Sequence, residues 1–230
     1  TQTAGCSLTA QQPEINIVRV AIQAMAGVLG GTQSLHTDSM DEALALPSEK
    51  AVQIALRTQQ IIAHESGVAN VADPLGGSYY LEWLTDDMER QSRDYFDRIE
   101  SLGGVVSAIE KGFFQKEIAA AAYKYQQEID NNERTVVGVN EFTSNEPVEI
   151  PILEMDPEGF ERQCRRLKNL RSSRDKARHE ASLTAIEKAA EGEENLMPHF
   201  IEAAKAKATL GEMCDVLRGV FGEYREGSDF

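Results

Sequence analysis

The first regular hydrophobic pattern lies between Pro13 and Leu29. Apolar residues recur there at steps of three and four, at Ile15, Val18, Ile22, Met25 and Leu29. This spacing places them on one side of a helix. Pro13 suits the first helical turn, and the Gly30-Gly31 pair supplies the stop. The pattern therefore predicts a helix from about Pro13 to Leu29.

Short segments on either side of this helix favour strands. Thr1–Thr9 is compatible with the end of a strand, and Thr32–Thr37 has the length of one. Pro47 and Ser48 then open a second helix, predicted from Glu49 to about Glu65. Strands and helices that alternate over short connections are typical of right-handed α/β units. Two such units cannot close a barrel or cover a sheet, so we expect this region to be part of a larger α/β fold.

The pattern becomes mainly helical after Gly76-Gly77. Thr85 is followed by two aspartates, which predicts an N-cap for a helix that runs to about Leu102. Further helices are predicted at Val105–Lys111, Lys116–Asn131 and Pro157–Glu191, and in the segment 196–230. Between them, Thr135–Val139 and Val148–Leu153 are predicted to form short strands.

Composition and charge exclude several classes of protein. The chain is 41% hydrophobic with seven prolines, which excludes a disordered tail and a collagen-like repeat. Its net charge of −15 repels phosphate backbones and anionic lipids, so neither nucleic acid nor a membrane is an expected partner. The three cysteines lie far apart, which favours reduced thiols and a cytoplasmic compartment, or the mitochondrial matrix in a eukaryote. Because the chain opens at Thr1 rather than Met, we expect it to be trimmed, processed or cut from a longer one.

The densest polar cluster runs from His36 to Glu42. It lies where a predicted strand ends, the edge at which parallel α/β proteins bind ligands. On one interpretation, Asp38 and Glu42 face a ligand and accept hydrogen bonds from its hydroxyls or amides. On the other, which is the more common situation, Asp38 or Ser39 caps a helix whose first turn is acidic. A metal site is not expected, because no second histidine follows at helical spacing and no HExxH or CxxC motif occurs.

Four longer motifs add a family resemblance. They are QTAGCSLTAQQPEINIVR from residue 2, GGTQSLHTDSMDEALALP from residue 30, DPLGGSYYLEWLT from residue 73 and VVGVN from residue 136. Together, in this order and spacing, they closely resemble the large, catalytic subunit of cobalamin-dependent methylmalonyl-CoA mutases and related acyl-CoA mutases. The resemblance extends from Thr1 to about Gly222.

The resemblance implies a fold and its division. Members of this family have a (β/α)8 TIM barrel that holds the acyl-CoA along its axis, then a helical linker, then a cobalamin domain that is fused or separate. Residues 1–87 resemble the last βα units of the barrel, and residues 88–230 resemble the mainly helical linker. The implied fold class is therefore α/β.

The resemblance also implies an activity. The family uses adenosylcobalamin to rearrange a carbon skeleton by radical chemistry, most often between methylmalonyl-CoA and succinyl-CoA. An isobutyryl-CoA or 2-hydroxyisobutyryl-CoA mutase is the alternative. Residues that position the acyl-CoA and the cobalt-ligating DxHxxG motif are absent from this chain, so we expect it to be inactive alone.

Partners follow from the same resemblance. We expect the remainder of the barrel, a cobalamin-binding domain or small subunit, the acyl-CoA substrate of the assembled enzyme and a G-protein chaperone. A hypothesis from another class is a non-catalytic interaction piece, which docks on such a complex through its helical half.

Two residues match the family's Q-T-[SA]-G motif at the barrel mouth, next to the cobalamin. They are Gln2 and Gly5. Gly5 suits this place physically, since a corrin pressed against the backbone leaves no room for a β-carbon.

Four more cofactor-binding residues follow from the second motif. Glu42 matches the carboxylate that approaches the cofactor's hydroxyls, with Ala43 and Ala45 beside the corrin. Asp38 stands where the family usually has Asn. This departure removes a donor and adds a charge.

Overall fold

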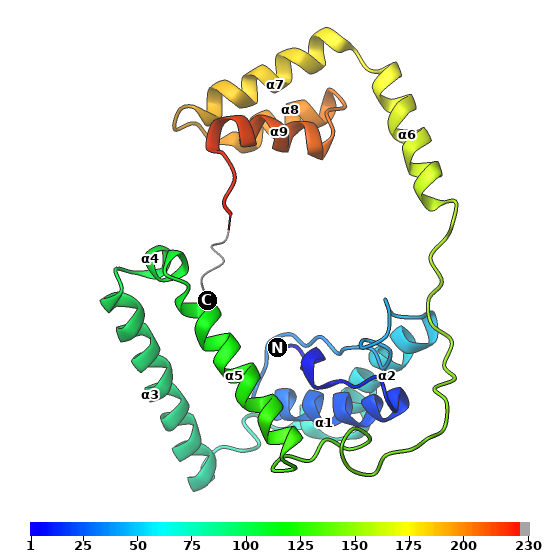
Figure 1. Ribbon diagram of the computed structural model, residues 1–230, viewed down its shortest axis with the longest axis vertical. Helices are drawn as coiled ribbons and strands as arrows, with labels where there is room; N and C mark the ends of the chain where they lie inside the picture. Colours follow the sequence, from blue (N-terminus) through cyan, green and yellow to red (C-terminus); the bar gives the residue numbers. More distant parts are fainter. Residues whose placement is uncertain (226–230) are drawn as a thin grey trace. The chain divides into compact units, whose positions relative to one another are not determined.

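The computed structural model describes residues 1–225, which are mainly helical (Figure 1). They divide into two compact units, residues 1–154 and the segment that begins at Met155. This division concerns packing within the chain, whereas the boundary at 87/88 is a family assignment and stays a prediction. No helix among the described residues has the length and apolar character needed to span a bilayer.

Two helices form the base of the first unit. Short 3₁₀ turns at Gly5–Ser7 and Pro13–Ile15 precede α1 (Asn16–Leu29), and α2 (Glu49–Glu65) follows it. The two helices pack together (Figure 1). They bury small and branched side chains, namely Val20, Ala24, Ala51 and Ile62. Both predicted helices are confirmed, the first with a 3₁₀ opening turn.

Isolated bridges replace the predicted strands. Gln2 pairs with His36 in a parallel bridge, and Val137 pairs with Glu141. Among residues 1–225, no strand longer than such a single bridge forms. The four predicted strands are therefore wrong for the described residues. The first two segments have one neighbour to pair with, and a parallel sheet is built from several. The strand predicted at 135–139 is instead a turn around Gly138, whose amide donates to the Glu141 carbonyl at 2.7 Å.

The helix predicted to begin at Thr85 begins earlier. α3 spans Tyr79–Ser101 and has Ser78 at its N-cap position. The Thr85 hydroxyl lies inside the helix and donates to the Leu81 carbonyl at 2.8 Å. The predicted cap is wrong because a threonine can satisfy its hydroxyl one turn back within a helix as well as at its start. The predicted end near Leu102 is confirmed.

Two further helices complete the first unit. α4 spans Val105–Glu110 and α5 spans Phe113–Asp130, which begins three residues before its predicted start. α5 is tied to α3, because Arg98 donates to Glu117 at 2.6 Å and the Tyr95 hydroxyl donates to the same carboxylate at 2.7 Å.

The second unit contains four helices among its described residues. They are α6 (Gly159–Ser173), α7 (Lys176–Ala190), α8 (Leu196–Lys205) and α9 (Leu210–Phe221). α7 packs against α8 and α9 (Figure 1). The single helix predicted over Pro157–Glu191 is wrong. Arg174 is extended, and Asp175 caps α7 by accepting a hydrogen bond from the Arg178 amide at 3.0 Å.

Candidate functional site

Two segments from different parts of the first unit lie side by side and carry most of the predicted site. The Thr3 amide donates to the His36 carbonyl at 3.1 Å, and the His36 amide donates to the Thr1 carbonyl at 2.9 Å. This pairing brings the motif of Gln2 and Gly5 next to the motif of Asp38 and Glu42.

Asp38 is buried within this pairing. Its side chain is 1% exposed, and one carboxylate oxygen accepts from the Thr3 hydroxyl at 2.8 Å. The other oxygen accepts from the Gln2 side-chain nitrogen Nε2 at 3.2 Å. The backbone amide of Asp38 donates back to the Thr3 hydroxyl at 2.9 Å. Thr3 and Asp38 therefore lock the two segments in register, and Asp38 orients Gln2.

The helix-cap interpretation of this cluster is wrong. α2 begins at Glu49, and its cap is the Ser48 hydroxyl, which accepts from the Ala51 amide at 3.3 Å. Asp38 and Ser39 lie well before that helix and cap nothing in it. The polar cluster is a loop with internal turns.

Gly5 lies over the Glu42 side chain. A β-carbon added at Gly5 would lie 3.5 Å from Glu42 Oε1 and 3.9 Å from Asp38 Oδ2, in ordinary van der Waals contact. Gln2, Glu42 and Ala43 are exposed, and Ala45 is half-buried. The structure thus brings Gln2, Gly5 and Glu42 together around one small surface.

Asp41 anchors the turn that carries Glu42. It is 0% exposed, and its carboxylate accepts from the Ser48 amide at 2.9 Å. Burial acts to raise the pKa of Asp41, but the hydrogen bonds, above all that from the Ser48 amide, outweigh this effect and hold the pKa below its usual value. An ionised Asp41 therefore links the loop to the start of α2.

Asn16 is a further buried polar residue at this site, and it is 0% exposed. Its side-chain amide donates to the carbonyls of Thr9 and Met40, both at 2.9 Å. Thr3, Asp41 and Asn16 were not among the predicted site residues. The one signal for Asn16 was a polar residue at the start of a mainly apolar helix.

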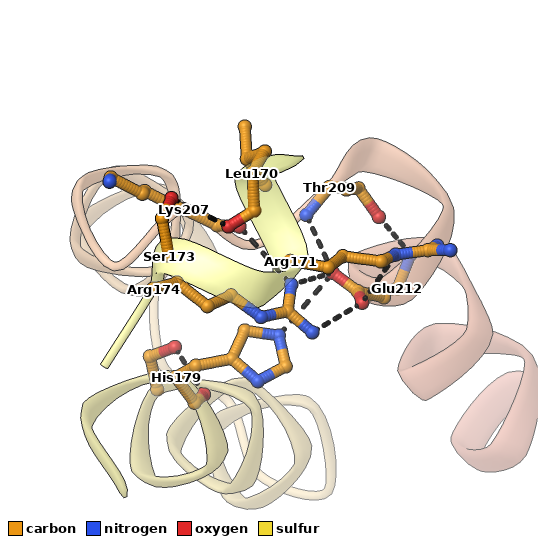
Figure 2. Close-up of polar contacts among 9 residues, drawn as sticks. Leu170, Arg171, Ser173, Arg174, His179, Lys207, Thr209 and Glu212 are labelled. Atoms are coloured by element: carbon orange, nitrogen blue, oxygen red, sulfur yellow. Dashed lines mark hydrogen bonds and ion pairs between the residues drawn. The ribbon is translucent and has the colours of Figure 1, made fainter. Parts of the chain in front are cut away.

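The second unit has its own polar cluster, centred on Glu212 (Figure 2). Arg174 donates to both carboxylate oxygens at 2.8 Å, and Arg171 and His179 lie 3.5 and 3.3 Å away. Glu212 also accepts from the Thr209 amide at 2.8 Å, which makes it part of the cap of α9. The cluster joins the α6–α7 break to α9, a structural role.

Candidate metal ligands do not converge. Within residues 1–225, no three His, Cys, Asp or Glu side chains are arranged to hold a metal ion. His36 Nε2 lies 3.4 Å from Asp38 Oδ1, and His199 lies 3.3 Å from Glu194. All three cysteines are free.

Comparison with known proteins identifies the family. The family model described as methylmalonyl-CoA mutase matches residues 1–223. The chain belongs to the methylmalonyl-CoA mutase family. This confirms the resemblance on which the site residues were chosen.

Three relatives illustrate the match. The large subunit of 2-hydroxyisobutanoyl-CoA mutase from Aquincola tertiaricarbonis is 47% identical over 98% of this chain and 40% of its own length. Human mitochondrial methylmalonyl-CoA mutase is 44% identical over 97% of this chain and 30% of its own length. The Escherichia coli methylmalonyl-CoA mutase is 42% identical over 97% of this chain and 31% of its own length. The chain therefore spans less than half the length of these family members.

Proposed function

We propose that this chain is the part of a cobalamin-dependent acyl-CoA mutase subunit that faces the cobalamin. Residues 1–87 are the last βα units of a (β/α)8 barrel, and residues 88–230 are the linker. The observation that carries the proposal is the Gly5 turn above Glu42, which the pairing of Thr3 with Asp38 holds in place.

The residues at this surface fit a corrin. Gly5 leaves its face free of a side chain, and Ala43 and Ala45 offer small apolar groups beside it. Glu42 is an exposed carboxylate that accepts hydrogen bonds from cofactor hydroxyls. The buried Asp38 acts through Gln2, whose amide nitrogen it holds at 3.2 Å.

Adenosylcobalamin supplies radical chemistry when it is bound. This chain's own residues bind and orient it and exclude water from one side of the site. Family membership supports an isomerase that rearranges an acyl-CoA, with methylmalonyl-CoA and succinyl-CoA as the main pair. A 2-hydroxyisobutyryl-CoA or isobutyryl-CoA substrate is the alternative, and the name of the relative that is 47% identical supports the first of these.

The proposed enzyme is an assembly. Its other parts are the remainder of the barrel, a cobalamin-binding domain or small subunit, and a G-protein chaperone, in the cytoplasm or the mitochondrial matrix. On this proposal the chain is inactive by itself.

The test is Glu42→Ala in the complete mutase. We expect the Kd for adenosylcobalamin, measured by calorimetry, to rise about tenfold, as for the loss of one hydrogen bond between charged and polar groups. Glu65→Ala is the matched control, because Glu65 is an exposed glutamate at the end of α2. If both variants bind the cofactor as tightly as the parent, this surface does not face cobalamin. An assembly that forms tightly with no cofactor dependence would support the non-catalytic interaction piece instead.

A further inference from the structure

Asn16 joins three parts of the first unit through one buried side chain. Its amide nitrogen donates to the Thr9 and Met40 carbonyls at 2.9 Å each. Its oxygen accepts from the Thr9 amide at 3.1 Å and from Arg19 Nη1 at 2.8 Å. Both donors and the acceptor oxygen are thus occupied, and the residue is 0% exposed.

The two tethered loops are the ones that form the proposed cofactor surface. Thr9 ends the segment that opens with the Gly5 turn, in which the Leu8 amide donates to the Gly5 carbonyl at 3.0 Å. Met40 is 4% exposed and comes two residues before Glu42. The separation between Gly5 and Glu42 therefore depends on this rigid amide group between the loops as well as on the pairing of Thr3 with Asp38.

We propose that Asn16 is a positioning residue for cobalamin: it sets the distance between the Gly5 turn and the Glu42 turn without touching the cofactor. This inference rests on the proposed function. A planar side chain with every polar group bonded has little freedom to move, which suits such a spacer.

The geometry makes the donor half of the amide essential. Asn16→Asp keeps the shape and still accepts from Thr9 and Arg19, but it faces the carbonyls of both Thr9 and Met40 with a second oxygen in place of the donor. Acceptors repel each other, so we expect both segments to move away from residue 16, and the Met40 segment carries Glu42 with it. A displacement near 1 Å at a binding group can cost about two orders of magnitude in function.

Asn140 provides a matched control. Its amide nitrogen also donates to two carbonyls, of Ile129 at 3.2 Å and Arg134 at 2.8 Å, and its oxygen accepts from the Val136 amide at 2.8 Å. None of these bonds involves the Gly5 or Glu42 loops, although the Val137 carbonyl in the same turn accepts from Arg19, which also donates to Asn16. Asn140→Asp therefore repeats the chemical change without altering any bond to the Thr9 or Met40 carbonyls.

The experiment compares Asn16→Asp, Asn140→Asp and Glu42→Ala in the complete mutase. For each, the Kd for adenosylcobalamin and for the acyl-CoA is measured by calorimetry, and the Tm by circular dichroism. We expect both asparagine variants to lower the Tm, and Asn16→Asp alone to raise the cobalamin Kd by at least about tenfold while the acyl-CoA Kd stays within about twofold.

Two outcomes overturn the inference. In the first, Asn16→Asp raises the cobalamin Kd no more than Asn140→Asp does, although Glu42→Ala raises it. This result would contradict the role of Asn16 but remain consistent with the proposed function. In the second, Asn16→Asp weakens both ligands equally, which marks a general structural role. If Glu42→Ala leaves the cobalamin Kd unchanged, the result contradicts the proposed function itself. Should Asn16→Asp fail to fold, Asn16→Ser keeps one donor without a charge, and a rise smaller than tenfold but above the Asn140→Asp value is expected.

Discussion

Arg174 binds Glu212 through two parallel hydrogen bonds of 2.8 Å each (Figure 2). The two side chains are 11% and 19% exposed, so this pair is better shielded from water than the surface pairs of the chain. Arg174 sits at the break between α6 and α7, whereas Glu212 lies in the first turn of α9. One ion pair therefore holds the break between α6 and α7 against the first turn of α9.

Removal of Arg174 is expected to destabilise the second unit. Arg174→Ala leaves Glu212 without its main partner, and breaking a shielded pair in this way costs about 2–4 kcal/mol. The measurement is the free energy of unfolding of the chain in urea. Lys205→Ala is the control, because Lys205 and Glu202 are both 59% exposed and their pair contributes less than about 1 kcal/mol. Equal effects of the two variants would contradict a special role for Arg174.

The same pair predicts an acid-dependent loss of stability. The Arg174 guanidinium, more than any other group, holds the pKa of Glu212 far below its usual value of 4.5. Because the unfolded chain then binds more protons than the folded one, the stabilisation is complete above about pH 4.5 and declines as the pH falls toward the folded pKa. We expect Glu212→Gln to flatten the dependence of unfolding free energy on pH between about 4.5 and 2. An unchanged slope would mean that other carboxylates dominate acid unfolding.

The helices that the sequence predicted well are those with local signals. The Gly30-Gly31 pair marks the end of α1 through its backbone, and Ser48 marks the beginning of α2 through its side chain. The break at Arg174 has a local signal in Asp175, which caps α7, but the surrounding Glu, Lys, Arg and Ala favour a helix on both sides of it. The pairing of Arg174 with Glu212, which lies 38 residues further on, also holds this break, and local periodicity does not reveal it.

A turn that the pattern mistook for a strand gives a third prediction. Gly138 has φ +82°, and a β-carbon there would lie 3.0 Å from Gln12 Cδ. Gly138→Ala is expected to cost about 2 kcal/mol in unfolding free energy, since it adds a contact to a strained backbone. Gly31 has a similar φ of +77°, but an added β-carbon there has no neighbour within 4 Å. Gly31→Ala should therefore cost only the backbone part of the unfolding free energy, about 1 kcal/mol. Equal losses would show that Gln12 moves aside freely.

The sequence named individual residues of the candidate site but not the connections between them. Gln2, Gly5 and Glu42 follow from family motifs, and the structure brings them together. Thr3 and Asn16 lie in the first of these motifs, but the sequence does not reveal their role, because a hydroxyl and an amide become supports only when a distant segment folds against them. Buried polar residues that bond two loops are therefore found from the structure, and they mark which loops must stay in register.

Gly5 offers the sharpest test of the cofactor surface. A β-carbon there meets Glu42 Oε1 at 3.5 Å, so the fold itself accepts Gly5→Ala, and the unfolding free energy should change by less than about 0.5 kcal/mol. On the proposed function, the added methyl group fills space that a corrin would need. Such overpacking costs about 1–3 kcal/mol, so the Kd for adenosylcobalamin in the complete mutase should rise about tenfold.

Gly219→Ala is the control for this substitution. A β-carbon at Gly219 has no neighbour within 4 Å, and the residue lies inside α9. The change should leave the cobalamin Kd unaltered and stabilise the helix by about 0.5–1 kcal/mol. If Gly5→Ala bound the cofactor as tightly as Gly219→Ala while folding normally, the Gly5 turn would have room that a pressed corrin does not leave. Cobalamin would then have to approach the chain elsewhere, and this result would contradict the proposed roles of both Gly5 and Glu42.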